Sequence, residues 1–303
     1  LLKMFLNIPY MTIRILRKKI SAIKKNISNS VKLFIIRCKS SMENLKQLCK
    51  YLLTLFVIGV FWHIGALCFG EYILPKPLNV LFFSFDYLRT KEFWGHFFIS
   101  SYRVCTALAI SFLAAFPLGI YMGYKKRFDS FFSPFLFLTY PVPKIVLLPL
   151  FFLILGIGDF SRIFLIVLTV SYQIIVVTRA SVLNLDKKYF ESFQSLLPLH
   201  VKGTPKQHFR MAKLVHLLIP SALPSALTAL RIASGTAIAV LFMAESFATR
   251  EGLGFLIMDS WGRGDMLPMF IGILSLCFLG VFLYEFCNLM ERLFCKGNQP
   301  NAK

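Results

Sequence analysis

The sequence predicts an all-α integral membrane protein with about six transmembrane helices and a long cytoplasmic loop between the fourth and the fifth of them. Three observations lead to this class. Hydrophobic residues make up 57% of the 303 residues and charged residues only 16%, a balance that a soluble domain of this length does not have. The apolar residues fall into six long stretches. The basic residues gather in the segments on one side of these stretches.

Each apolar stretch is long enough to cross the hydrocarbon core of a bilayer as a helix, which takes about 20 residues. Because the number of stretches is even, both termini are expected on the same side of the membrane. The predicted spans cover residues 51–69, 102–123, 131–155, 162–183, 222–246 and 269–290.

The distribution of lysine and arginine predicts which side holds the termini. Twenty-four of the 34 basic residues lie in the termini or in the loops on the side of the termini, and seven lie in the opposite loops. Since cytoplasmic loops carry an excess of basic residues, both ends and the loop at 184–221 are predicted to be cytoplasmic. The net charge of +20 then reflects membrane topology, and no nucleic acid is expected as a partner.

The chain is predicted to have three parts. Residues 1–50 form a basic N-terminal arm, in which apolar residues recur every three or four positions between lysines. This pattern is typical of an amphipathic helix on an anionic membrane surface. Residues 51–292 form the transmembrane domain, and residues 293–303 form a cytoplasmic tail. The seven cysteines form no CxxC pair, so neither a metal site nor a disulfide framework is expected.

The loop at 184–221 is predicted to hold two short amphipathic helices. Asn184 or Asp186 can cap the first helix, which covers Tyr189 to Leu197 before Pro198 ends it. The second begins in the stretch "GTPKQ", where a threonine, the proline after it and a glutamine have the order of a capping box. Such helices either dock on a partner protein or lie among lipid headgroups, and the pattern alone leaves both readings open.

Two charged residues inside the predicted spans are candidates for a translocation path. Lys144 lies among the three prolines of 141–149, which predict an irregular, bent segment that must be buried or line a cavity. Glu245 stands near the outer end of the fifth span, where a carboxylate is costly unless it is solvated or paired. Glu245 is either a pathway or gate residue, or an interfacial carboxylate paired with Arg250 or with a neighbouring helix.

Several motifs, in order and at compatible spacing, resemble one family over residues 71–292. They include "ILPKPLNVL", "YPVPKIVLLPLFFLILGIGDFSRIFLIVL" and "AESFATREGLGFLI". The stretch "LLIPSALPSALTALR" is similar to a signature of the form LPAALP followed by LR. The family is the membrane permease subunit of bacterial binding-protein-dependent ABC importers, in its nitrate, sulfonate and taurine branch.

The resemblance implies the partners and the location of the protein. Such a permease is a multi-pass protein of the inner membrane and is expected to form a homodimer in the lipid bilayer. It works with a dimer of ABC ATPase subunits and with a periplasmic solute-binding protein. The expected solute is small and anionic or sulfonate-like. Because the binding protein chooses the solute, nitrate, sulfonates, taurine, bicarbonate and thiamine-precursor-like molecules all stay open.

In that family a short helix with the pattern EAA-x3-G-x9-I-x-LP sits in a cleft of the ATPase subunit, so the loop at 184–221 is the expected coupling loop. The best match starts at Glu191, with Ser192 and Phe193 in place of the two alanines. Leu197 then stands in place of the glycine, and Pro220 lies about ten residues beyond its expected position. Either the loop carries an insertion around "PLHVKGTPKQ", which is the preferred interpretation, or the match at Glu191 is wrong.

The resemblance also gives Pro220 and Pro224 a role, as an elbow that transmits ATPase movement to the pore helices. The chain lacks the GxxxxGK[ST] motif, so no ATP hydrolysis and no cofactor are expected on it, and ATP–Mg is expected on the partner ATPase. A secondary transporter is the alternative, but it would carry inverted repeats and paired acids within spans, which the sequence does not show. A membrane enzyme would need a cluster of His, Asp or Glu at one membrane face, and the sequence shows no such cluster.

Overall fold

The computed structural model describes residues 49–196 and 212–295. The predicted amphipathic N-terminal arm, Leu197 and the start of the second loop helix, at "GTPKQ", lie outside the described residues. Every regular element within the described ranges is a helix, which confirms the predicted all-α class. The chain divides into two compact units, residues 1–77 and residues 78–303.

In the first unit, the described part is a membrane-length helix, Cys49–Phe69, followed by a turn. Gly70 takes a positive φ of 81°, a conformation that glycine adopts without strain, and it ends the helix. The indole N–H of Trp62 donates to the carbonyl of Pro75 at 3.1 Å, so the turn folds back along the end of its own helix.

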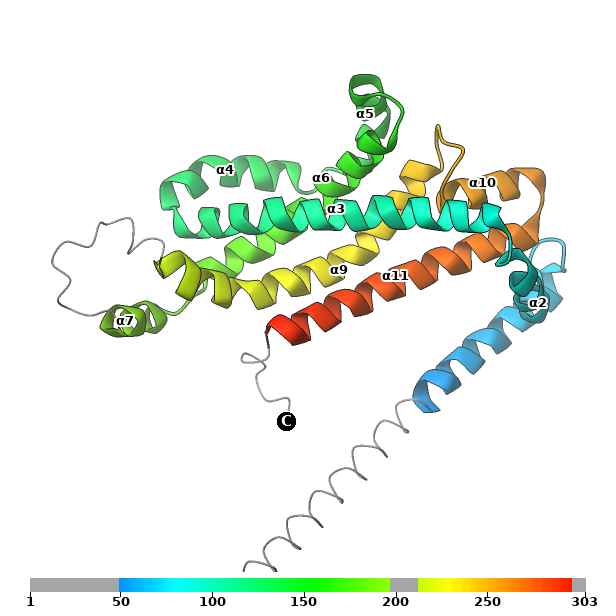
Figure 1. The fold of residues 1–303 in the computed structure, drawn as a ribbon, viewed down its shortest axis with the longest axis horizontal. Coiled ribbons are helices and arrows are strands. Elements are labelled where there is room, and N and C mark those ends of the chain that lie inside the picture. The colour runs from blue at the N-terminus through cyan, green and yellow to red at the C-terminus, as the bar shows by residue number, and fades with distance from the viewer. Residues whose placement is uncertain (1–48, 197–211, 296–303) are drawn as a thin grey trace, which may run out of the picture. The chain divides into compact units, whose positions relative to one another are not determined.

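The second unit is a bundle of long helices. Figure 1 shows α3, α6, α9 and α11 as long helices that run side by side, with α7 at one end of the bundle and α10 at the other. These ends are called the α7 end and the α10 end below. The elements are α2 (Pro77–Tyr87), α3 (Lys91–Tyr124), α4 (Lys126–Thr139), η1 (Lys144–Leu147), α5 (Leu148–Leu155), α6 (Asp159–Leu183), α7 (Lys187–Leu196), η2 (Leu214–Leu218), α9 (Ile219–Glu245), α10 (Leu253–Arg263) and α11 (Met266–Phe294).

The prediction of about six spans is confirmed. Within residues 49–196 and 212–295, five helices are long and apolar enough to cross a membrane, and the number of candidate spans rises to six if the bent pair α4 and η1–α5 counts as one span. The second span is longer than predicted, because α3 begins at Lys91 and not at residue 102. The side-chain hydroxyl of Thr90 accepts the N–H of Phe93 and caps this polar first turn, which an apolar pattern cannot reveal.

Close packing of α3 against α6 forms the centre of the bundle. A Cβ added at Gly119 would lie 2.7 Å from Cβ of Thr178, and one added at Gly123 would lie 2.6 Å from Cβ of Val182. Both glycines therefore let the two backbones approach each other, as small residues do in membrane helix pairs. On α9, the buried face consists largely of alanine, which keeps that helix slim where α6 and α11 pack on it.

The predicted irregular segment near Lys144 is confirmed. Helix α4 ends at Thr139, and the two halves of the broken span meet at an angle of 86°. Two prolines, Pro141 and Pro143, lie in the break, where their missing N–H groups and fixed φ angles prevent a continuous helix. Pro149 lies in the first turn of α5, a position at which proline is well tolerated.

Candidate functional site

A buried polar stripe lies on α3 at the α10 end of the bundle. His96, Ser100 and Arg103 are spaced by four and three residues, so they share one face of the helix. All three side chains are buried, and the guanidinium-bearing side chain of Arg103 is only 2% exposed. Buried polar groups require partners. Each of these three finds its partner on a segment far away in the sequence.

The first partner is Glu245, the last residue of α9, whose side chain is 0% exposed. Its carboxylate accepts hydrogen bonds from Ser100 Oγ at 2.7 Å, from Arg103 Nη1 at 2.7 Å and from the backbone N–H of Gly254 at 3.0 Å. A buried carboxylate is tolerated when a paired cation and several donors surround it. Arg103 is the cation paired with Glu245, and Ser100 and Gly254 supply the further donors.

The same stripe holds the beginning of α10. The first N–H groups of a helix have no partner within the helix, and they carry its positive dipole end. The N–H of Gly252 donates to His96 Nδ1 at 3.1 Å, and the N–H of Leu253 donates to Ser100 Oγ at 2.7 Å. With the bond from Gly254 to Glu245, side chains of α3 and α9 satisfy the N–H group of Gly252, the N-cap residue, and those of the first two residues of α10.

Two glycines make this contact sterically possible. Gly252 has a φ of 113°, and a Cβ at this position would overlap the carboxylate of Glu245. A Cβ at Gly254 would lie 2.7 Å from both Cβ of Glu245 and the carbonyl oxygen of Phe242. Below, the name α10 latch denotes the group of His96, Ser100, Arg103, Glu245, Gly252 and Gly254.

Two arginines connect the α10 latch to α6. Arg103 donates from Nε and Nη2 to Oδ1 of Asp159, the first residue of α6, at 2.8 and 2.6 Å. Arg162, on the next turn of α6, donates to the carbonyl oxygens of Ala244 and Ala248, at 3.3 and 2.5 Å. The latch therefore joins α3, α6, α9 and α10. The negative charges of Asp159 and Glu245 balance the positive charges of Arg103 and Arg162.

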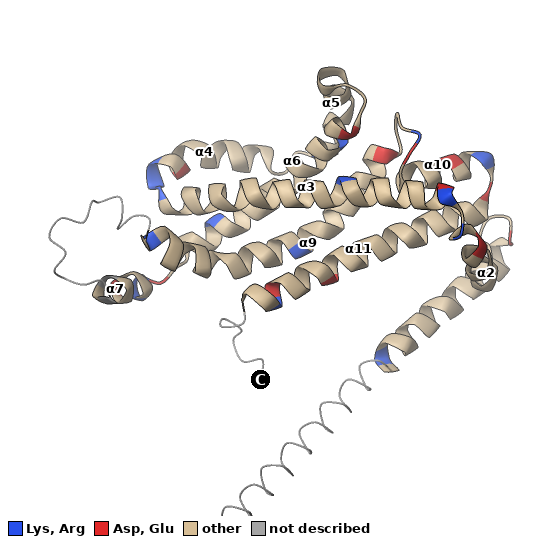
Figure 2. Cartoon of the chain, in the orientation of Figure 1, with Lys and Arg blue, Asp and Glu red and all other residues tan. Residues whose placement is uncertain are grey.

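Figure 2 shows that the charged residues gather towards the helix ends, with few along the middle of the bundle. One of the inner charges, Arg231, lies on α9 and pairs with Glu291 of α11 at 3.1 Å. Arg231 also donates to Asn288 at 3.1 Å. A positive charge at this depth requires a partner, and the structure gives Arg231 one on the neighbouring helix.

Lys144 lies at the break in the span, and its side chain is buried. Its ammonium group donates to the carbonyl oxygens of Thr139, Tyr140 and Val142, at 3.0, 2.8 and 3.3 Å. It also lies 4.2 Å from the centre of the Tyr172 ring of α6, a cation–π distance. These partners are all neutral, and within residues 49–196 and 212–295 no carboxylate forms an ion pair with Lys144.

The predicted coupling segment lies at the α7 end. As expected for its cap, the carboxylate of Asp186 accepts the N–H of Lys188 at the start of α7, at 3.2 Å. Phe190 packs against a cluster on α3, α6 and α9, and the ammonium group of Lys213 lies 4.4 Å from its ring centre. The other predicted contact residues lie further out: Glu191 and Ser192 are exposed, and Phe193 is half-buried.

Pro220 and Pro224 lie within a continuous helix rather than at a break. The local irregularity is η2, a π-turn of five residues, in which the N–H of Ile219 donates to the carbonyl of Leu214. A π-turn before Pro220 displaces the carbonyl that the proline ring would otherwise meet, so the helix passes the proline intact. Ser221 donates its hydroxyl to the carbonyl of Leu217 at 2.7 Å.

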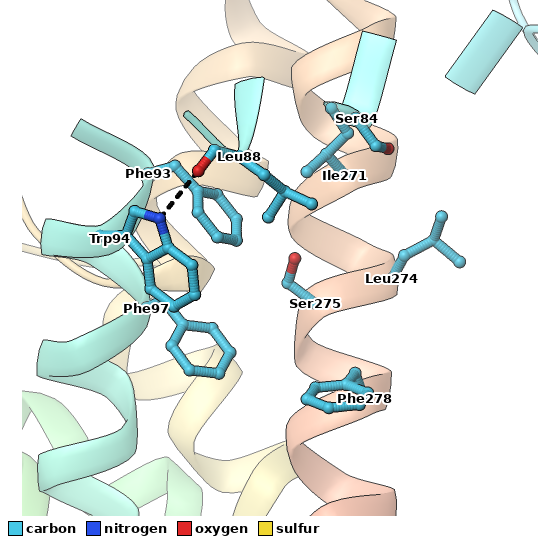
Figure 3. Close-up of a pocket in the computed structure, with 9 residues that line it drawn as sticks. All are labelled: Ser84, Leu88, Phe93, Trp94, Phe97, Ile271, Leu274, Ser275 and Phe278. Atoms are coloured by element: carbon cyan, nitrogen blue, oxygen red, sulfur yellow. Dashed lines mark hydrogen bonds between the residues drawn. The ribbon is translucent and has the colours of Figure 1, made fainter. Parts of the chain in front are cut away.

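The structure also has an apolar cavity of about 320 Å³ between α2, α3 and α11. In Figure 3, the ring of Trp94 lies along one side, with its N–H donating to the carbonyl of Leu88 at 2.8 Å, while Phe278 lies on the opposite side. No charged side chain lines this cavity, so it lacks the groups that recognise an ionic solute. Among the described residues, no group of His, Cys, Asp and Glu could hold a metal ion.

The sequence interpretation missed most of the α10 latch. It gave no role to His96 or Ser100, and it treated Arg103 and Asp159 only as charges of the outer loops. The spacing of His96, Ser100 and Arg103 was a usable signal, since polar residues four and three apart beside an apolar run mark one buried helix face.

Comparisons with known proteins are consistent with this architecture. The family model "Binding-protein-dependent transport system inner membrane component" matches residues 115–294. The chain is 28% identical to a protein of Bacillus subtilis named as an aliphatic sulfonates transport permease, over 81% of this chain and 86% of that protein. It is also 28% identical to the formylaminopyrimidine transport permease protein of Halalkalibacterium halodurans, over 79% and 93% of the two chains. The taurine transport system permease protein of Escherichia coli is 28% identical, over 75% and 80%.

Proposed function

Because the chain belongs to the family of binding-protein-dependent transport system inner membrane components, and is the permease subunit of an ABC importer, we propose that it carries a small organic anion, such as a sulfonate, across the inner membrane. Two of the relatives are named for aliphatic sulfonates and for taurine, which is itself a sulfonate. The third is named for a formylaminopyrimidine, so an uncharged or cationic solute is the competing assignment.

The observation that carries the anion proposal is the environment of Lys144. Its hydrogen bonds go to three backbone carbonyls and its nearest ring is Tyr172, so its positive charge is solvated but not neutralised by those partners. Irregular backbone at membrane depth is tolerated where it is buried in protein or lines a water-filled cavity. We place this break beside the translocation path, where a fixed cation lowers the energy of an anion that passes it, without direct contact.

The second part of the proposal concerns the partners. Helix α7 docks on an ABC ATPase subunit through the exposed Glu191 and Ser192 and the half-buried Phe193 beside them, and the ATPase binds ATP–Mg and carries out hydrolysis. Phe190 supports this arrangement, because it anchors α7 to the bundle while Glu191 and Ser192 remain exposed. The excess of basic residues on their side supports a cytoplasmic location for the termini and the α7 end, and this orientation is part of the proposal. A periplasmic binding protein then delivers the solute to the α10 end of a permease homodimer.

Uptake by cells that express the permease with its ATPase and binding protein tests the solute class. Radiolabelled taurine or a short alkanesulfonate should accumulate, and a neutral formylaminopyrimidine should not. The variant Lys144→Met should reduce the maximal rate of sulfonate uptake about tenfold, while Lys144→Arg should retain most of it, since it keeps the charge. Uptake of the pyrimidine alone, or equal sulfonate uptake by the Met variant, would show that the anion proposal is wrong.

A further inference from the structure

We propose that Glu245 is a positioning residue that makes α9 and α10 move as one body during the transport cycle. The inference rests on the permease function for the existence of such a cycle, and on the α10 latch for its mechanism. It goes beyond a pathway role for Glu245, because the carboxylate faces its donors in the protein interior and lines none of the described cavities.

The connection between the two helices is too short and too well held to act as a free hinge. Six residues, 246–251, separate the end of α9 from Gly252. Arg162 binds the carbonyl oxygen of Ala248 within this connection, and Arg103 binds the carbonyl oxygen of Glu251 at 3.0 Å. The chain thus turns back so that the last residue of α9 receives the N–H of Gly254.

The electrostatics of the latch keep it closed. If α10 moved away from α9, the buried carboxylate of Glu245 would lose the Gly254 donor, and the N–H groups of Gly252 and Leu253 at the start of α10 would lose their partners as well. No water-exposed face of the carboxylate is available to replace these bonds, since Glu245 is fully buried. A change at the α10 end is therefore expected to displace α9 rather than to open the latch.

Helix α9 can transmit that displacement. It is an unbroken helix of 27 residues, about 40 Å long at 1.5 Å per residue. Its other end follows the π-turn η2 and contributes Ala222 to the cluster that holds Phe190 of α7. A movement of α10 when a loaded binding protein arrives would thus reach the coupling segment through one continuous helix.

Two glycines of α10 provide a matched pair of variants. In Gly254→Ala, the new Cβ collides with Glu245 and forces the latch apart, whereas in Gly262→Ala the new Cβ meets nothing within 4 Å. With the purified complex, we expect Gly254→Ala to keep basal ATP hydrolysis. The stimulation of hydrolysis by the loaded binding protein should fall about tenfold. Gly262→Ala should behave as the wild type. Full stimulation of Gly254→Ala, or an equal loss in Gly262→Ala, would overturn the proposal.

A distance measurement in the permease alone provides a readout that does not depend on activity. Spin labels at Ile232→Cys on α9 and Gly262→Cys on α10, both exposed positions, should give one narrow distance distribution in a background without native cysteines. Glu245→Gln should broaden this distribution, and the neutralisation of an exposed acid in Glu92→Gln should not. A narrow distribution in Glu245→Gln would show that the carboxylate does not hold α10.

The same label pair tests the one-body movement once the ATPase is added. The distance should be identical with and without bound ATP, and a shift beyond the width of the distribution would mean that the latch opens in the cycle. A separate label at Tyr189→Cys, on the exposed face of α7, reports whether the ATPase docks there. Failure of the proposed docking is therefore distinguishable from failure of the latch.

Discussion

Oε2 of Glu245, at the end of α9, accepts the backbone N–H of Gly254, at the start of α10, at 3.0 Å. The bond joins two helices that follow each other in the chain, and it does so inside a buried network rather than on the surface. It also explains why the sequence between them contains the glycines of "REGLG", since a side chain at Gly252 or Gly254 would occupy the space of the carboxylate.

Removal of the arginine at the centre of this network should destabilise the fold. In Arg103→Met, Glu245 keeps its buried position but loses its cation, and breaking a buried pair in this way costs about 3–5 kcal/mol. Thermal unfolding of the purified protein in detergent should show a large decrease in the midpoint. Arg263→Met, which removes an exposed pair with Asp259, should cost about 1 kcal/mol or less. Equal effects of the two variants would contradict the buried network.

The packing of α3 against α6 gives a second prediction. In Gly123→Val, the side chain would overlap Val182 of α6, and overpacking of this kind costs about 1–3 kcal/mol or more. Gly95→Val, on the same helix, is the control, because an added Cβ at Gly95 meets nothing within 4 Å. The yield of folded protein in the membrane should fall in the first variant only, and a normal yield of Gly123→Val would argue against the close approach of the two helices.

The sequence predicted the spans and the class of the protein because hydrophobic length is a property of a single segment. It also predicted the bend near Lys144, since prolines act locally. It could not predict the α10 latch, in which Ser100 meets Glu245 across 145 residues of chain. It likewise could not distinguish a proline elbow from the intact helix with a π-turn that the structure has at Pro220. A proline removes one helical hydrogen bond, and either a bend or a π-turn can accommodate that loss.

The orientation in the membrane is tested by labelling single engineered cysteines in intact cells. A thiol-reactive, membrane-impermeant reagent should reach Asp265→Cys at the α10 end and should not reach Tyr189→Cys on α7, although both positions are exposed. Permeabilised cells should allow labelling of both and thereby show that each cysteine is reactive. Labelling of Tyr189→Cys from outside would reverse the proposed topology.

Pro224 should affect coupling rather than assembly. Pro224→Ala restores a backbone N–H that can donate to the carbonyl of Pro220, so the first turns of α9 become a stiffer, more regular helix. We expect the complex to assemble normally while the number of solute molecules imported per ATP falls. Pro149→Ala is the control, since a proline in the first turn of α5 replaces an N–H that has no helical partner. An unchanged import ratio in Pro224→Ala would remove this proline from the coupling mechanism.

We propose that this permease imports its solute only through an ATPase bound at α7, and uptake into proteoliposomes is the decisive measurement. The wild-type permease, reconstituted with its ATPase and supplied with the loaded binding protein, should accumulate the solute only when ATP is present on the ATPase side. Phe193→Asp places a charge on the half-buried docking face of α7 and should abolish both ATPase binding and uptake, whereas Ser195→Asp, at an exposed position on the same helix, should retain both. ATP-independent uptake driven by an ion gradient, or full uptake by Phe193→Asp with the ATPase bound, would contradict the account.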